Sequence, residues 1–141
     1  MTQKEKELLL KDLCARLPYH VKCQMEDDFI INDSQLYDYI LSEKHIELFR
    51  NHKGFYIKPY LRPMSSITEE ERKEIGDLIK ENRSSPYGII NNKGIDNLLF
   101  SVSVTSSFLI DWLNAHHFDY RELIEKGLAI AVTKENNPYK E

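Results

Sequence analysis

The chain has 141 residues and a formal net charge of −4, from 19 basic and 23 acidic side chains. A hydrophobic fraction of 41% and a charged fraction of 30% are typical of a folded globular domain, which excludes a disordered or membrane-spanning chain. The acidic balance argues against broad, non-specific binding to nucleic acid or anionic lipid.

The first predicted element is an amphipathic helix over residues 2–17. Its start matches a capping box, in which Thr2 and Glu5 each satisfy a backbone donor of the other. Its apolar stripe has helical spacing and consists of Leu10, Leu13, Cys14 and Leu17. We expect this stripe to face the core and the opposite face, which includes Asp12 and Arg16, to lie in water.

Residues 20–60 predict an antiparallel meander of short strands. Alternation over 20–25 indicates a strand with one buried face, and 29–31 a second strand. The segment 35–50 fits a helix or strands, but its aromatic and β-branched content favours strands. A hairpin turn at 52–54 leads to a returning strand at 55–58.

Two prolines, Pro59 and Pro63, then indicate an extended connector along a sheet edge. A helix begins after Thr68, because Thr68 and Glu71 form a second capping box, and it continues to about residue 82. The turn-rich stretch 83–94 contains a short strand at 89–90.

The last part of the chain predicts a strand–helix–helix–strand unit. Alternation indicates a strand over 98–104, followed by a helix that carries Trp112. Asp119 starts a second short helix, which ends at Gly127, and 128–132 form the last strand. We expect residues 133–141 to be a loose polar tail.

Together these elements predict one α+β domain over residues 1–141. It has an N-terminal helix, a small antiparallel sheet, a middle helix and the C-terminal unit. Two forms of the sheet fit the pattern, an open sheet and a barrel-like one. If the domain has a seam, it lies at 59–67. The apolar run near the N-terminus is too short for a signal peptide or a membrane span, and two cysteines form no disulfide framework. We therefore expect a cytoplasmic protein with no membrane partner.

Three blocks of sequence carry a resemblance to a known family. They are residues 4–19, residues 57–71 with the words KPYLRPMSS and TEEE, and residues 111–129 with the words DWLNAHHFDYR. The chain resembles a family of small uncharacterised proteins of gut bacteria that are often encoded among prophage-like or mobile genes. The blocks cover about a third of the chain. The resemblance implies a phage-related or mobile-element context, and it carries no catalytic residue or cofactor.

The histidine pair His116-His117, with Tyr120 nearby, is the first candidate for an enzyme site. Histidine binds metals and titrates near neutrality. Adjacent helical residues, however, project about 100° apart and cannot easily hold one ion. The spacing therefore favours a structural role, and we predict no metal and no cofactor. Cys14 and Cys23 both lie on apolar faces, where cysteine acts as a small hydrophobic residue.

A second candidate site is the basic and aromatic segment 44–62. Basic side chains interleaved with aromatic ones are typical of single-stranded nucleic-acid binding. The residues that would form this interface are Lys44, Arg50, Lys53, Tyr56, Lys58 and Arg62. Ordinary strand alternation explains the same pattern, with aromatic side chains inward and basic ones in water.

The sequence contains neither a nucleophile elbow nor a phosphate-binding glycine loop. This favours a non-enzymatic role, and our first hypothesis is a small binding or accessory protein that engages a protein partner. The alternatives are a nucleic-acid-binding module that uses 44–62, and an enzyme with a site near His116, His117 and Tyr120.

Overall fold

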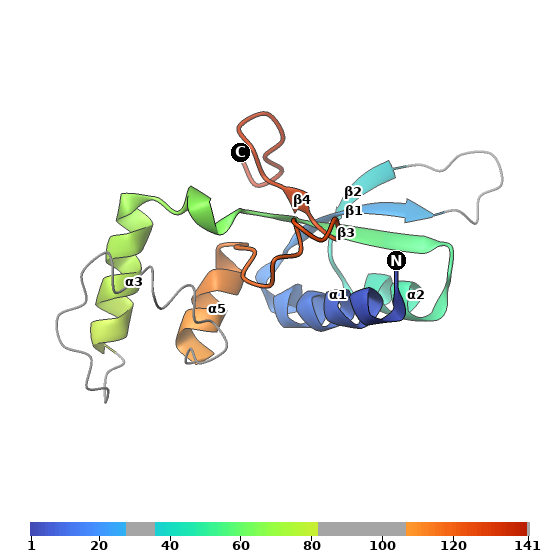
Figure 1. Cartoon of the computed structure of the whole chain (residues 1–141), viewed down its shortest axis with the longest axis horizontal. Coiled ribbons are helices and arrows are strands. Elements are labelled where there is room, and N and C mark those ends of the chain that lie inside the picture. The colour runs from blue at the N-terminus through green and yellow to red at the C-terminus, as the bar shows by residue number, and fades with distance from the viewer. Residues whose placement is uncertain (28–35, 82–106, 141) are drawn as a thin grey trace.

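Figure 1 shows a computed structural model, which describes residues 1–27, 36–81 and 107–140. Its helices are α1 (Gln3–Arg16), α2 (Glu43–Asn51), α3 (Glu69–Glu81) and α5 (Ser107–Ala115), with 3-10 turns η1 (Leu17–Tyr19) and η2 (Met64–Ser66). Its strands are β1 (Lys22–Asp27), β2 (Leu36–Ile40), β3 (Phe55–Leu61) and β4 (Ile130–Ala131). This confirms the α+β class. The strands predicted at 29–31, 89–90 and 98–104 lie outside the described residues.

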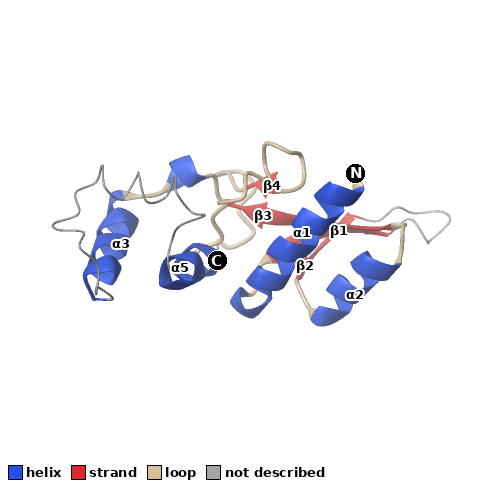
Figure 2. Ribbon diagram, turned by 60° about the horizontal axis from the view of Figure 1, so that its bottom comes forward, coloured by secondary structure: helices blue, strands red, loops and turns tan. Residues whose placement is uncertain are grey.

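The four strands form one open sheet in the order β2-β1-β3-β4. β1 is antiparallel to both neighbours, whereas β4 runs parallel to β3 and pairs with it at Tyr60 and Leu61. The sheet is therefore mixed and not barrel-like. Helices α1 and α2 lie side by side on one of its faces (Figures 1 and 2).

The strand prediction for 35–50 is right for β2 and wrong for α2. Ser42 and His45 form the helix start, because the backbone N–H of Ser42 donates to His45 Nδ1 at 3.1 Å. Ile46 and Phe49, three positions apart, are both buried against the sheet. The aromatic content of this segment favours a strand locally, which is why the prediction was wrong. A helix places residues three positions apart on one face, and this lets both side chains pack against the sheet.

The predicted connector after residue 58 is also corrected, because β3 continues to Leu61. Pro59 is opposite Cys23 of β1, and Tyr60 is opposite Ile130 of β4. β3 is therefore an inner strand and not an edge. It follows α2 directly, so the turn at 52–54 joins a helix to a strand and is not a hairpin turn.

No second helix follows Asp119, and the segment before β4 consists of turns. Asp119 instead holds these turns together, because its carboxylate accepts from the backbone N–H groups of Leu123 and Ile124, each at 2.9 Å. Gly127 has a φ of +73°, the left-handed conformation that glycine adopts without strain. The predicted last strand is confirmed, although it spans only Ile130–Ala131.

The buried apolar residues form two clusters. One joins the sheet to α1 and α2, and the other joins α3 to α5 around Trp112. The chain passes from the first to the second within the predicted seam, since Leu61 belongs to the first cluster and Met64 packs on the second. In the parts of the chain that the structure describes, no helix is both long and apolar enough to cross a membrane.

Candidate functional site

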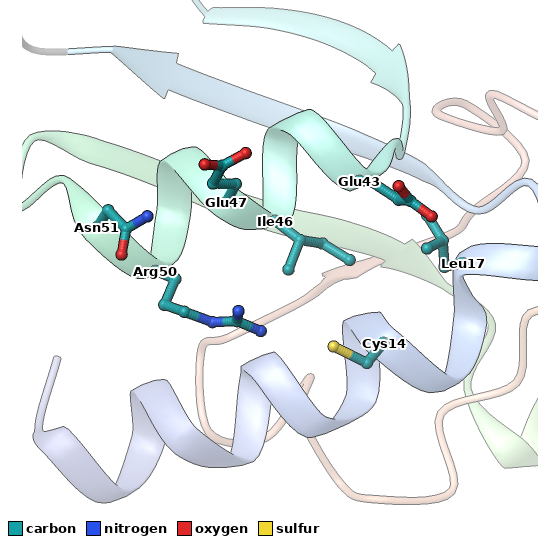
Figure 3. Close-up of a pocket in the computed structure, with 7 residues that line it drawn as sticks. All are labelled: Cys14, Leu17, Glu43, Ile46, Glu47, Arg50 and Asn51. Carbon is teal, nitrogen blue, oxygen red and sulfur yellow. The ribbon is translucent and has the colours of Figure 1, made fainter.

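A groove of about 410 Å³ opens between α1 and α2 (Figure 3). It is lined by Cys14, Leu17, Glu43, Ile46, Glu47, Arg50 and Asn51. We call it the α1–α2 groove. One wall of the groove is α2, which begins after Ser42. Its helical spacing places Glu43, Glu47 and Arg50 about one turn apart, on the same side of the helix.

The α1 side of the groove comes from a helix that is rotated relative to the prediction. Leu9 and Leu13 are fully buried, but so are Asp12 and Arg16, which were expected in water. Cys14, expected in the core, is exposed, and Leu17 is only partly buried. The predicted apolar stripe is thus divided. Leu13 enters the core, whereas Cys14 and Leu17 face the groove.

A buried charge network explains this rotation. The Asp12 carboxylate accepts from Arg16 Nε at 2.7 Å and from Arg121 Nη1 at 2.9 Å. Arg16 Nη2 donates to the Phe118 carbonyl oxygen at 2.7 Å, which ties α1 to the segment after α5. A buried guanidinium requires such partners, so these bonds determine which face of α1 turns inward.

The groove combines an apolar floor with a charged rim. Leu17 and Ile46 supply the floor, and two carboxylates and one guanidinium stand around it. Figure 3 shows the Arg50 guanidinium and the Cys14 thiol pointing toward one another from the two helices. Such a surface suits the binding of an amphipathic ligand.

The two cysteines lie in opposite environments. Cys14 is exposed at the groove, whereas Cys23 is buried in β1. Burial raises the pKa of the Cys23 thiol, which keeps it protonated and unreactive. Cys14 is therefore the thiol that a chemical reagent reaches.

The predicted enzyme residues do not converge on one point. His116 stacks on Trp112 at 4.0 Å between ring centroids, and His117 stacks on Tyr139 at 3.9 Å. The Tyr120 hydroxyl donates to Asn114 Oδ1 at 2.8 Å. Within residues 1–27, 36–81 and 107–140, no group of three histidine, cysteine or acidic side chains could hold a metal ion.

Comparison of the chain with protein-family models, curated proteins and solved structures found no match. The interpretation of the site therefore depends on the geometry of the groove and the chemistry of its lining.

The predicted nucleic-acid residues occupy different parts of the fold. Tyr56 and Lys58 are exposed on the sheet face that points away from α1 and α2, since the alternate residues Phe55 and Ile57 are buried in the core. The remaining members lie elsewhere. Lys44 and Arg50 are on α2, Lys53 is in the turn before β3, and Arg62 follows β3. The structure brings together only Tyr56 and Lys58.

Arg62 is held by contacts within the chain. Its Nη1 and Nη2 donate to the two carboxylate oxygens of Glu71, each at 2.7 Å, and its guanidinium lies 4.1 Å from the centroid of the Phe118 ring. Burial alone would raise the pKa of Glu71. The bonds from Arg62 and Thr68 outweigh it and lower that pKa to about 2.

We expect Glu71→Gln to lower the free energy of unfolding by about 1–2 kcal/mol at pH 7 and to have little effect at pH 2. The folded pKa lies below the ordinary value of 4.5, so this contribution is full above pH 4.5 and is lost as pH falls toward 2. Urea unfolding at several pH values measures it. The matched control is Glu70→Gln, an exposed neighbour in the same helical turn. An equal loss in both variants would contradict the prediction.

Proposed function

We propose that this protein is a non-enzymatic accessory protein that binds a protein partner in the α1–α2 groove. The observation that supports this is the divided stripe of α1. Cys14 and Leu17 face an open groove with Ile46, while charged Asp12 and Arg16 take the buried positions. Ile46 is buried, so the accessible apolar surface of the groove comes from exposed Cys14 and half-buried Leu17. Apolar surface that lines a groove is typical of a protein-binding site.

The chemistry of the rim defines the partner segment. Glu43 and Glu47 lie four residues apart on α2, and neither forms an ion pair with another described residue. An amphipathic helix that places apolar side chains on Cys14 and Leu17 can present basic side chains to these carboxylates. We therefore commit to a partner helix with an apolar stripe flanked by lysine or arginine.

We further propose that the protein acts in the cytoplasm, where an exposed thiol such as Cys14 stays reduced. The resemblance to prophage-encoded proteins adds that the partner belongs to phage or mobile-element biology. Neither point is needed for the binding experiment.

Cross-linking from Cys14 tests the proposal directly. Benzophenone maleimide labels Cys14 selectively because Cys23 is buried. We expect irradiation in an extract of the native host to produce an adduct whose cross-linked peptide has the apolar and basic pattern. Leu17→Glu, at a half-buried position of the groove, should reduce the adduct at least ten-fold, and Glu47→Lys should weaken it.

Two controls separate groove binding from general adhesion. In the first, Cys14→Ser is combined with Ser65→Cys, which moves the label to the exposed η2 turn. In the second, Lys73→Glu changes an exposed charge on α3, away from the groove. Equal adducts from residue 65, or adducts that Leu17→Glu leaves unchanged, would contradict the proposal.

A further inference from the structure

Tyr139 closes one end of the β1–β3 ladder. The last paired residues there are Cys23 and Pro59, so Lys22 and Tyr60 would form the next pair. Instead, the Tyr139 hydroxyl accepts from the Lys22 backbone N–H at 2.9 Å and donates to the Tyr60 carbonyl oxygen at 2.8 Å. The segment that was expected to be a loose tail is anchored at this point.

Two further contacts hold the same segment. Lys22 Nζ donates to the Pro138 carbonyl oxygen at 2.6 Å. The Tyr139 ring stacks on His117 with an angle of 8° between the ring planes. His117 has a φ of +62°, a left-handed conformation that a non-glycine residue rarely adopts. The strained backbone is therefore held in place by its surroundings, which include Tyr139.

The titratable groups that act on His117 are all basic. They come from α1 (Arg16), the residue after η1 (His20), the residue after β3 (Arg62) and the residue after α5 (His116). The nearby carboxylates are already engaged, because Asp12 binds Arg16 and Glu71 binds Arg62. His117 Nδ1 is buried and has no hydrogen-bond partner in the described parts of the chain.

We propose that residues 137–140 form a latch on the β1–β3 ladder, which neutral His117 holds closed and a positive charge on His117 opens. A charged imidazole must donate from both ring nitrogens, yet the buried Nδ1 faces no acceptor. The ring then turns toward water and loses its stack on Tyr139. Opening frees the Lys22 N–H and the Tyr60 carbonyl at the end of the sheet.

The direction of the pH dependence follows from the closed state. Burial first, and then Arg16 and the other basic neighbours, lower the pKa of His117 from 6.5 to about 4. The ring in the open latch has its ordinary pKa. The closed latch is therefore fully favoured above pH 6.5 and loses stability as pH falls toward 4. The opening equilibrium should rise about 20-fold from pH 7 to pH 5.

Hydrogen exchange of the Lys22 amide measures opening, because its N–H is bonded to the latch. After correction for the intrinsic exchange rate, we expect its protection to fall about 20-fold from pH 7 to pH 5. The Met25 amide reports on the sheet itself, since β1 has a neighbouring strand on each side. A parallel loss of protection at Met25 would overturn the proposal.

Three variants complete the test. His117→Phe keeps an aromatic ring against Tyr139 but cannot gain a charge, so its Lys22 protection should not change with pH. His116→Phe is the matched control and should behave as the parent chain. Tyr139→Phe keeps the stack without the hydroxyl and should leave Lys22 poorly protected at every pH. A pH-dependent Lys22 amide in His117→Phe, or a fully protected one in Tyr139→Phe, would show that there is no such latch.

Discussion

Replacing Asp12 by alanine should lower the free energy of unfolding by about 3–5 kcal/mol. The Asp12 carboxylate is fully buried and binds two guanidinium groups, those of Arg16 and Arg121. Without it, Arg16 keeps its charge in the interior, and among the described residues it retains one hydrogen bond, to the Phe118 carbonyl oxygen, beside the Tyr120 ring. Urea unfolding followed by circular dichroism measures the loss.

Two further variants show that the loss comes from the unpaired charge. Arg121 is 20% exposed, so Arg121→Ala leaves Asp12 bonded to Arg16 and should cost about 1 kcal/mol. The double variant Asp12→Leu with Arg16→Met removes both charges and should be more stable than Asp12→Ala alone. A cost below 1 kcal/mol for Asp12→Ala would mean that the network does not hold α1 in place.

Replacing Trp112 by alanine should lower the free energy of unfolding by about 3–5 kcal/mol. Its ring lies between His116 and Phe118, with centroids 4.0 Å and 5.8 Å away, and its Nε1 donates to Glu74 at 3.1 Å. Trp112 thus joins α5 to α3, and the cavity left by alanine would separate them. Circular dichroism is the appropriate measurement, because the chain has no other tryptophan.

The hydrogen bond and the packing of Trp112 can be separated. Glu74→Gln keeps an acceptor for the indole N–H and should cost less than 1 kcal/mol, while Trp112→Phe keeps part of the ring volume and should cost about 1–2 kcal/mol. If Trp112→Ala were as stable as the parent chain, the α3–α5 cluster would not be a core.

Helix starts were predictable because their determinants are local. Thr2 with Glu5, and Thr68 with Glu71, form the expected reciprocal capping bonds. The buried face of the predicted strand at 20–25 was also predictable, since Val21, Cys23 and Met25 alternate with polar residues and all three are buried. Caps and alternation depend on neighbours within a few residues.

The groove could not be predicted from the same patterns. Helical spacing places Cys14 and Leu17 on one stripe, but it does not distinguish a stripe that meets the core from one that lines a groove. That difference depends on Arg16, whose partner Phe118 lies 102 residues away in the chain. Arg50 was singled out for nucleic acid, and only the helical state of α2 places it at the groove.

The sequence by itself determined the α+β class, both capping boxes and the alternating strand β1, because each depends on short-range spacing. Tertiary structure alone decided the rotation of α1, the helical state of α2 and the docking of Tyr139 on His117. Each of these depends on contacts between distant segments, whose free energies exceed the local preferences that oppose them.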